Sequence, residues 1–254
     1  MFVPTSEALA IWLSPAVLGL LGLCVGSFLN VVVHRLPRLM ERQWWTDVAG
    51  QLQDAEAWQR SFDAPRPAAV AAVAEDLGTR ISAWTPYSLS RPRSACPQCG
   101  HAITWYENIP LLSWLWLRAR CSACKSPIPA RYPIVEAITG LLFAGAGWHF
   151  GGQPVVLLWC SVLAALVALS GVDWDTTLLP DSLTQPLLWA GLVAAVAGWT
   201  VPLATAVTGA VVGYLSLWSI YWLFKLATGK EGMGYGDFKL LAAIGAWLGW
   251  QAIL

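Results

Sequence analysis

The stretch Gly232-Met233-Gly234-Tyr235-Gly236-Asp237-Phe238-Lys239 places one carboxylate at the start of an apolar segment. Glycine permits tight turns and close backbone approaches that a Cβ would forbid, so this run suits a loop that presents Asp237. Residues 240–250 carry no charge and predict a helix that enters lipid. An acid at such a boundary is costly to ionise and is a candidate functional residue. The alternative is that Asp237 only caps the following helix.

The composition indicates an integral membrane protein. Of the 254 residues, 57% are hydrophobic, only 12% are charged and 17 are tryptophan, which is too apolar for an ordinary soluble domain. Apolar stretches predict six spans, at residues 8–33, 133–148, 154–172, 183–199, 204–226 and 238–254. We expect an all-α polytopic helical bundle whose first helix ends at Pro37.

The basic residues predict the orientation. Of the 15 lysines and arginines, 12 lie between Arg35 and Arg131. Positive charge marks the cytoplasmic side, so this segment is expected inside and the N-terminus outside. Counting six spans onward places the remaining lysines inside as well. Because no basic residue precedes Arg35, we expect the first apolar run to stay in the protein as a span rather than to act as a signal peptide.

This pattern divides the chain into a first transmembrane helix (1–37), a cytoplasmic domain (38–132) and a transmembrane catalytic bundle (133–254). The cytoplasmic domain contains Cys96, Cys99, Cys121 and Cys124 in a C-x2-C-x21-C-x2-C pattern. Four thiolates at this spacing can close a tetrahedral shell around Zn²⁺, which favours a structural metal. Two disulfides or four free thiols are the alternatives. His101 is expected to be a spectator beside the cysteines.

Three acids, Asp173, Asp175 and Asp181, follow the third span on the side expected to face the cytoplasm, where Asp237 also lies. Two carboxyl groups that meet in a low dielectric share one proton. Such a dyad can activate water and polarise a peptide carbonyl, which is the chemistry of aspartic proteolysis. Physical reasoning does not choose between Asp173 and Asp175, and it predicts that Asp181 caps a helix.

Three further questions stay open at this point. Glu136 either stabilises the first turn of its helix or takes part in the site. A transporter or proton relay could use the same aspartates, but it favours acids near the bilayer midplane and broken helices. A structural scaffold would leave the glycine loop unexplained. Membrane lipid is the expected environment, and no nucleic-acid partner is indicated.

Five motifs together resemble the type IV prepilin peptidases, which are bacterial inner-membrane aspartic proteases of the Gly-x-Gly-Asp type. They are Gly26-Ser27-Phe28-Leu29-Asn30 with His34-Arg35-Leu36-Pro37, the four cysteines, Arg131-Tyr132-Pro133-x-x-Glu136, Asp173 through Leu179-Pro180-Asp181, and Gly234-Tyr235-Gly236-Asp237-Phe238-Lys239-Leu240. The resemblance covers nearly the whole chain, with the motifs in the same order.

The resemblance implies that the protein removes the basic leader of type IV prepilins and type II secretion pseudopilins at the cytoplasmic face. It also implies methylation of the new N-terminus from S-adenosylmethionine. By the family motif the catalytic acids are Asp173 and Asp237, and the four cysteines bind zinc. The resemblance does not indicate where S-adenosylmethionine binds.

Two departures from the family pattern carry expectations. Members generally continue for two more spans, so the chain is expected either to be truncated after its sixth span or to be naturally short. Relatives often have glycine and then a basic residue before the third cysteine, where this chain has Arg118-Ala119-Arg120. If the backbone there needs an angle that favours glycine, we expect impaired methyl transfer and intact cleavage.

Overall fold

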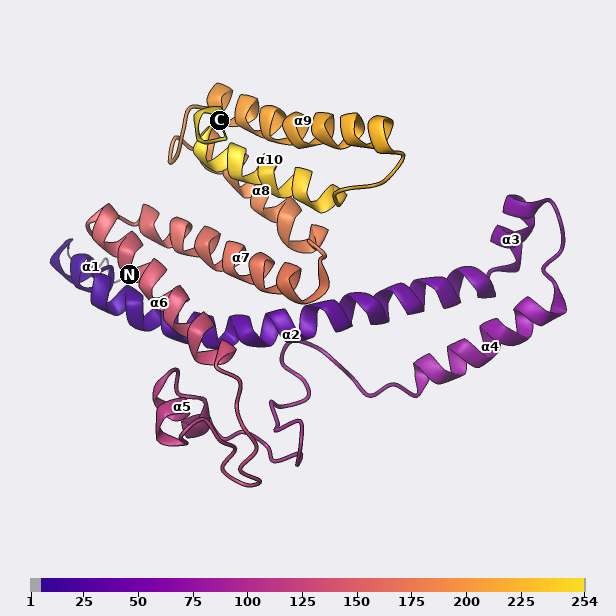
Figure 1. Cartoon of the computed structure of the whole chain (residues 1–254), viewed down its shortest axis with the longest axis horizontal. Helices are drawn as coiled ribbons and strands as arrows, with labels where there is room; N and C mark the ends of the chain where they lie inside the picture. Colours follow the sequence, from indigo (N-terminus) through magenta and orange to yellow (C-terminus); the bar gives the residue numbers. More distant parts are fainter. Residues whose placement is uncertain (1–5, 254) are drawn as a thin grey trace.

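The computed structural model describes residues 6–253 and is helical, with no strand in that part of the chain (Figure 1). The long helices are α2 (Pro15–Gln53), α4 (Ala68–Ser82), α6 (Arg131–Phe150), α7 (Val155–Thr176), α8 (Asp181–Val196), α9 (Leu203–Thr228) and α10 (Tyr235–Leu248). The short helices are α1 (Ser6–Trp12), α3 (Ala55–Phe62), η1 (Trp105–Asn108), α5 (Leu112–Trp116) and η2 (Trp250–Ala252). The expected all-α class is confirmed.

Helices cover all six stretches expected to span the membrane. Three of them, α2, α7 and α9, are long and apolar enough to cross a membrane by length and composition. The other stretches correspond to α6, α8 and α10, which have 20, 16 and 14 residues. A straight span needs about 20 residues, so α8 and α10 are short for one. Leu254, the expected end of the last span, lies outside the described residues.

The prediction that Pro37 ends the first helix is wrong. Helix α2 continues without interruption through Pro37 and ends only at Gln53. Proline removes one backbone donor, but good helix formers follow it. Near the end of the helix, Gln53 donates a hydrogen bond to the Ala74 carbonyl of α4. Tertiary packing of α4 therefore supports the part of α2 that the local signal assigned to a loop.

The beginning of the first span also differs from expectation. A break after Trp12 separates α1 from α2, and Ser14 has extended backbone angles. Pro15 explains the break, because proline disfavours helical angles in the residue before it and is well accommodated in the first turn of a new helix. Only the part from Pro15 onward is a continuous helix long enough to span.

Three buried clusters hold the bundle together, and one of them joins α2 to α7 through Leu29, Val32 and Ala168. Two others set the arrangement of the remaining helices. One joins α2, α6 and α7 through Leu18, Phe143 and Val156. The other joins α7, α8 and α10 through Leu169, Leu187, Ala243 and Trp247 and their neighbours, and the Trp247 indole N–H donates to the Leu187 carbonyl at 2.8 Å. Because α7 belongs to both clusters, it connects the first half of the bundle to the half that contains α10 (Figure 1).

Candidate active site and metal centre

Asp173 and Asp237 lie at the same end of the bundle, on different helices. Asp173 is in the last turn of α7, whose end is closed by a hydrogen bond from the Thr177 backbone N–H to the Asp173 carbonyl. Asp237 is in the first turn of α10. Figure 1 shows the end of α7 and the start of α10 on the same side of the bundle. Helices α8 and α9 separate the two acids in the sequence.

Two contacts bring the loop after α7 to the start of α10. A Cβ added to Gly236 would lie 2.7 Å from the Leu179 Cβ, so only glycine permits this approach. Lys239 Nζ lies 2.7 Å from Asp181 Oδ1 and forms an ion pair with that carboxylate. The residues flanking Asp237 thus contact the segment that follows Asp173. The close approach predicted for the glycine run is found at Gly236.

Two of the four acids in this region are already engaged. Arg131 lies at the start of α6, and its Nη1 is 2.6 Å from Asp175 Oδ1. Lys239 engages Asp181, as described above. Within the described residues no ion pair involves Asp173 or Asp237. The arrangement therefore separates Asp173 from Asp175, which the sequence had left equivalent.

The capping alternatives for Asp237 and Asp181 do not describe the structure. Gly234 is the N-cap of α10, and no side-chain capping hydrogen bond is formed there. Pro180 is the N-cap of α8, so Asp181 is the first helical residue and not the cap predicted from the sequence. Both acids still lie in first turns, where the helix dipole favours negative charge.

Glu136 has a structural role different from the one expected. Its side chain is buried in the second turn of α6, and Oε2 accepts a hydrogen bond from the Leu111 backbone N–H at 2.8 Å. Leu111 has a φ of 59° immediately before α5. The carboxylate therefore stabilises the start of α5. It also ties the segment that carries the four cysteines, here called the cysteine domain (residues 96–124 with their flanking turns), to the bundle. Because Leu111 and Glu136 belong to different elements, no local sequence signal predicts this contact.

Arg35 has a related role that the sequence did not reveal. It lies two residues before Pro37, where the first helix was expected to end, but it is 7% exposed and lies in the middle of α2. Its guanidinium donates to the carbonyls of Ser88 and Pro92, at 2.9 and 2.8 Å. These bonds hold the chain that leads into the first pair of cysteines.

The four cysteines come together as predicted. The sulfur atoms of Cys96, Cys99, Cys121 and Cys124 all lie within 4.8 Å of one another, and all four are free thiols. The Sγ atoms of Cys96 and Cys124 are 3.7 Å apart. A disulfide requires about 2.05 Å, whereas four sulfurs at about 2.3 Å from a tetrahedral metal are separated by about 3.8 Å. The geometry fits a metal shell and not a pair of disulfides.

The two C-x2-C segments fold into matching turns. In the first, the Gly100 N–H donates to the Cys96 carbonyl, and in the second the Lys125 N–H donates to the Cys121 carbonyl. Each turn is closed by an isolated β-bridge, Ala95 with Ala102 and Arg120 with Pro127. The residue after the second cysteine has a positive φ in both, 72° at Gly100 and 60° at Lys125. Local turns thus preorganise the ligands.

The thiols have the electrostatic properties of a cation site. Hydrogen bonds from the Cys99 backbone and the Ser126 hydroxyl lower the pKa of Cys96 to about 6. The His101 backbone lowers the pKa of Cys99, but the neighbouring sulfurs outweigh it and raise that pKa to about 11. A bound cation stabilises the thiolate at Cys96 and lowers the cost of ionising the neighbouring thiols. The four sulfurs therefore fit Zn²⁺.

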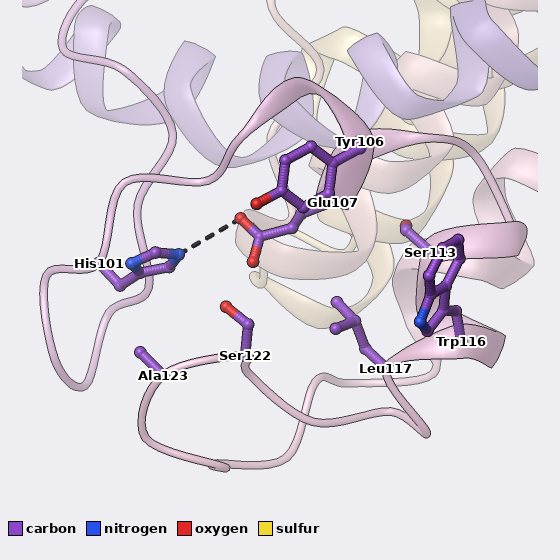
Figure 2. Close-up of a pocket in the computed structure, with 8 residues that line it drawn as sticks. All are labelled: His101, Tyr106, Glu107, Ser113, Trp116, Leu117, Ser122 and Ala123. Atoms are coloured by element: carbon purple, nitrogen blue, oxygen red, sulfur yellow. Dashed lines mark hydrogen bonds and ion pairs between the residues drawn. The ribbon is translucent and has the colours of Figure 1, made fainter.

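His101 lies outside the sulfur cluster, as expected. Its Nε2 is 3.3 Å from Glu107 Oε2, and the same oxygen accepts hydrogen bonds from the Thr104 backbone N–H and hydroxyl (Figure 2). Hydrogen bonds from the Ser122 hydroxyl, and then from Thr104, lower the pKa of Glu107 to about 2. Sequence reasoning missed Glu107, although Thr104 and Glu107 have the spacing of a capping box.

The backbone before the third cysteine has the positive φ that favours glycine, at the position where this chain has Ala119. Ala119 has a φ of 58° and Arg118 a φ of 52°, both in the left-handed region. Hydrogen bonds from the Ala119 N–H to the Trp114 carbonyl, and from the Ile128 N–H to the Ala119 carbonyl, maintain this conformation. The backbone at Ala119 thus has an angle that favours glycine. Impaired methyl transfer with intact cleavage stays a prediction.

Comparison with known proteins gives consistent matches over both halves of the chain. Residues 20–150 match the family model of the bacterial peptidase A24 N-terminal domain, and residues 160–254 match that of the type IV leader peptidase family. No solved structure gives a significant match.

Curated relatives cover most of the chain. A protein of Aeromonas hydrophila is 51% identical over 242 residues, which are 95% of this chain and 76% of the relative. One from Stutzerimonas stutzeri is 49% identical over 253 residues, 98% of this chain and 76% of the relative. One from Pseudomonas aeruginosa is 51% identical over 239 residues, which are 92% of this chain and 72% of the relative. Each bears the name prepilin leader peptidase/N-methyltransferase. With the paired aspartate segments and the four-cysteine cluster, these matches show that the chain belongs to the type IV leader peptidase family.

Proposed function

We propose that this protein is a membrane-embedded aspartic endopeptidase that removes the basic leader of type IV prepilins and type II secretion pseudopilins and then methylates the new N-terminus. The relatives named above carry both activities in their names. The observation that carries the peptidase proposal is the contact between the start of α10 and the loop after α7, at Gly236 and Lys239. This contact supports a pairing of the segments that carry Asp173 and Asp237.

The catalytic residues we propose are Asp173 and Asp237. Asp175 and Asp181 are engaged by Arg131 and Lys239, so they are held as ion-paired carboxylates. In the proposed dyad, one ionised carboxylate removes a proton from water while the protonated partner donates a hydrogen bond to the scissile carbonyl. The second carboxyl then supplies the proton that the leaving amine requires. No covalent intermediate is formed.

The cysteine cluster is proposed to hold one structural Zn²⁺. Four sulfur ligands complete the tetrahedral shell and leave no position for substrate, so the ion would order the turns and take no part in hydrolysis. S-adenosylmethionine, when bound, would be the methyl donor, because its sulfonium activates a methyl group for transfer to the new N-terminal amine. These two groups are the cofactors of the proposal.

The proposed location is the bacterial inner membrane, with the N-terminus in the periplasm and the aspartates at the cytoplasmic face. The basic segment between Arg35 and Arg131 supports this orientation. The division into a first span (1–37), a cytoplasmic domain (38–132) and a catalytic bundle (133–254) also stays a proposal. The substrate agrees with it, since a basic leader would remain in the cytoplasm and the scissile bond would lie at the start of an apolar helix.

The transporter alternative receives no support from the arrangement. It favours acids near the bilayer midplane on interrupted helices. Here the four aspartates lie at or just beyond helix ends on one side of the bundle, and α7 and α9 are continuous.

Incubation with a prepilin that carries a basic leader tests the peptidase proposal. We expect Asp173→Asn and Asp237→Asn each to lower the cleavage rate by about 10³-fold or more, because each removes one member of the acid–base pair. Asp175→Asn, which removes only an ion-paired carboxylate, is the matched control and should stay within about tenfold of wild type. Full cleavage by folded Asp237→Asn would refute the dyad. If Asp175→Asn lowers the cleavage rate as much as Asp173→Asn does, the choice of Asp173 is refuted.

A further inference from the structure

Methyl transfer requires a site for the methyl donor that the aspartate pair does not supply. A cavity of about 340 Å³ lies on the cysteine domain, between η1, α5 and the second C-x2-C turn (Figure 2). This volume lies within the range of about 300–1,000 Å³ that small-molecule sites occupy. Its walls are formed by His101, Tyr106, Glu107, Ser113, Trp116, Leu117, Ser122 and Ala123.

One wall of the cavity is apolar and aromatic. Tyr106 and Trp116 are 56% and 86% exposed, so their rings are available to a ligand, and Leu117 lies beside them. Aromatic side chains stack on nucleobases with about 1–3 kcal/mol per base, and their faces also attract cations. This wall therefore suits a ligand that combines a nucleobase with a positive charge.

The Glu107 carboxylate lies beside Tyr106, on the η1 side of the cavity (Figure 2). Its side chain is only 7% exposed, and all its hydrogen bonds to Thr104 and its contact with His101 use Oε2. Figure 2 shows the other carboxylate oxygen turned toward the hollow and the Ser122 hydroxyl. The Ser122 hydroxyl already donates to this carboxylate, so the carboxylate offers a ligand its fixed negative charge, which attracts a cationic centre. The carboxylate and the aromatic rings face the same space.

A second cavity is smaller and has no carboxylate among the residues that line it. It measures about 160 Å³ and is lined by Ile220, Tyr221, Phe224, Gly232 and Met233. Lys225 Nζ lies 3.2 Å from the Tyr221 hydroxyl at its edge. This cavity is smaller than the usual range of ligand sites, and the adjacent Lys225 ammonium is already ion-paired with Glu231. It does not fit a sulfonium nucleoside.

We propose that the cavity between Glu107 and Trp116 binds the methyl donor, a sulfonium nucleoside of the S-adenosylmethionine type. Trp116 and Tyr106 receive the adenine ring, and Glu107 faces the cationic half of the molecule. The proposal rests on the methyltransferase part of the proposed function and names its cofactor site.

The position of the cavity is compatible with that role. Only the short segment 125–130 separates Cys124 from Arg131, and Arg131 is ion-paired with Asp175 in the last turn of α7. The Glu136 bond to Leu111 holds the start of α5 against α6. The cysteine domain is thus tethered at two points beside the helix end that carries Asp173. A donor bound there lies on the domain that adjoins the proposed cleavage site.

Equilibrium binding of radiolabelled S-adenosylmethionine to the full-length protein in detergent tests the proposal. Trp116→Ala should weaken binding about tenfold, because the stacking surface is lost. The matched control is Trp148→Ala, which removes another highly exposed tryptophan, one near the end of α6 and outside the cavity, and should change the affinity by less than about twofold. Equal affinities of the two variants would overturn the proposed site.

Glu107→Gln gives a second, charge-specific readout. Wild type should prefer the cationic sulfonium over the neutral thioether S-adenosylhomocysteine, and the variant should lose about tenfold more affinity for the sulfonium than for the thioether. Because Glu107 also caps η1, zinc content is measured to confirm that the domain is folded. An unchanged ratio in a zinc-loaded variant contradicts the role of Glu107.

The failure of this site and the failure of the proposed function give different results. If wild type binds the sulfonium but Trp116→Ala binds it equally well, the donor site is elsewhere and methyl transfer stands. If wild type binds no sulfonium at all, both the site and the methyltransferase proposal are overturned. Prepilin cleavage by wild type is measured in parallel and reports on the peptidase alone.

Discussion

The cysteine cluster and the aspartate site are assembled in opposite ways. The four cysteines lie close together in the sequence, between positions 96 and 124, and are oriented by two matching local turns. Asp173 and Asp237 are far apart in the sequence and reach one end of the bundle only because α8 and α10 pack on α7. A site built from local turns is encoded by spacing, whereas a site built from distant helix ends depends on packing between helices. The two sites should therefore respond differently to mutation.

Metal removal should have the largest effect and should be confined to the cysteine domain. Structural zinc is bound with about 10–16 kcal/mol of apparent free energy, much of which is folding free energy. We expect Cys121→Ser to lower zinc content from about one ion per chain to near zero. Trypsin should then cut at Arg118, Arg120 and Lys125 while the bundle stays intact, as measured by metal analysis and limited proteolysis.

Cys24→Ser is the control for that experiment, because Cys24 is an exposed free thiol outside the cluster. It should retain zinc and resist trypsin as wild type does. Full zinc content in Cys121→Ser would contradict the four-sulfur shell, and unfolding of the bundle on metal removal would contradict the independence of the two sites.

Gly236→Ala should have the next largest effect, and on the aspartate site alone. The new methyl group would overlap Leu179, so α10 or the loop after α7 must shift. Misplacement of catalytic groups by about 1 Å can cost about 100-fold in rate, so we expect a loss of that size in prepilin cleavage with zinc content unchanged. The matched variant is Gly234→Ala, whose Cβ would meet only Asp237 Oδ2, at 3.8 Å.

Gly234→Ala should cleave within about threefold of wild type, because Gly234 has extended angles that alanine also adopts. If both variants lose activity equally, the close approach at Gly236 is not what positions Asp237.

Ala119→Gly should stabilise the cysteine domain. A left-handed conformation costs an L-residue about 1 kcal/mol, and glycine avoids that cost. Denaturant-induced zinc release should therefore shift to higher denaturant concentration, and methyl transfer should rise while cleavage stays unchanged. Ala102→Gly, at an exposed position without a positive φ, should leave zinc release unchanged or make it easier. Earlier zinc release in Ala119→Gly would show that the backbone angle is not strained.

The ion pair between Lys239 and Asp181 should have the smallest effect. The two side chains are 29% and 61% exposed, so water and salt screen their attraction. A double-mutant cycle with Lys239→Ala and Asp181→Ala, read out as cleavage rate, should give a coupling of about 0.2–1 kcal/mol that declines with added salt. A salt-independent coupling of several kcal/mol would mean that this pair, and not Gly236, holds the aspartate site together.

The sequence predicted the helices of the bundle well and their ends less reliably. Expected spans at residues 154–172 and 204–226 agree within a few residues with α7 and α9, because long apolar runs have no alternative in a membrane. Pro37 was misread, since a proline signal is local while the support for α2 comes from α4, far along the chain. The same reason explains why Arg35, two residues before Pro37, is buried within α2 and does not lie at a helix end.

The sequence by itself determined the all-helical class, the four cysteines that could hold a metal and the short set of acids that could form a dyad. Composition, local turns and side-chain chemistry are properties of neighbouring residues. Only the tertiary structure decided which acids remain without an ion pair among the described residues. It also decided that Glu136 bonds to Leu111 and Arg35 to Ser88, and that Glu107 and Trp116 line one cavity. Those outcomes depend on contacts between separate elements of the chain, which are formed by helix packing and domain closure and leave no periodic trace in the sequence.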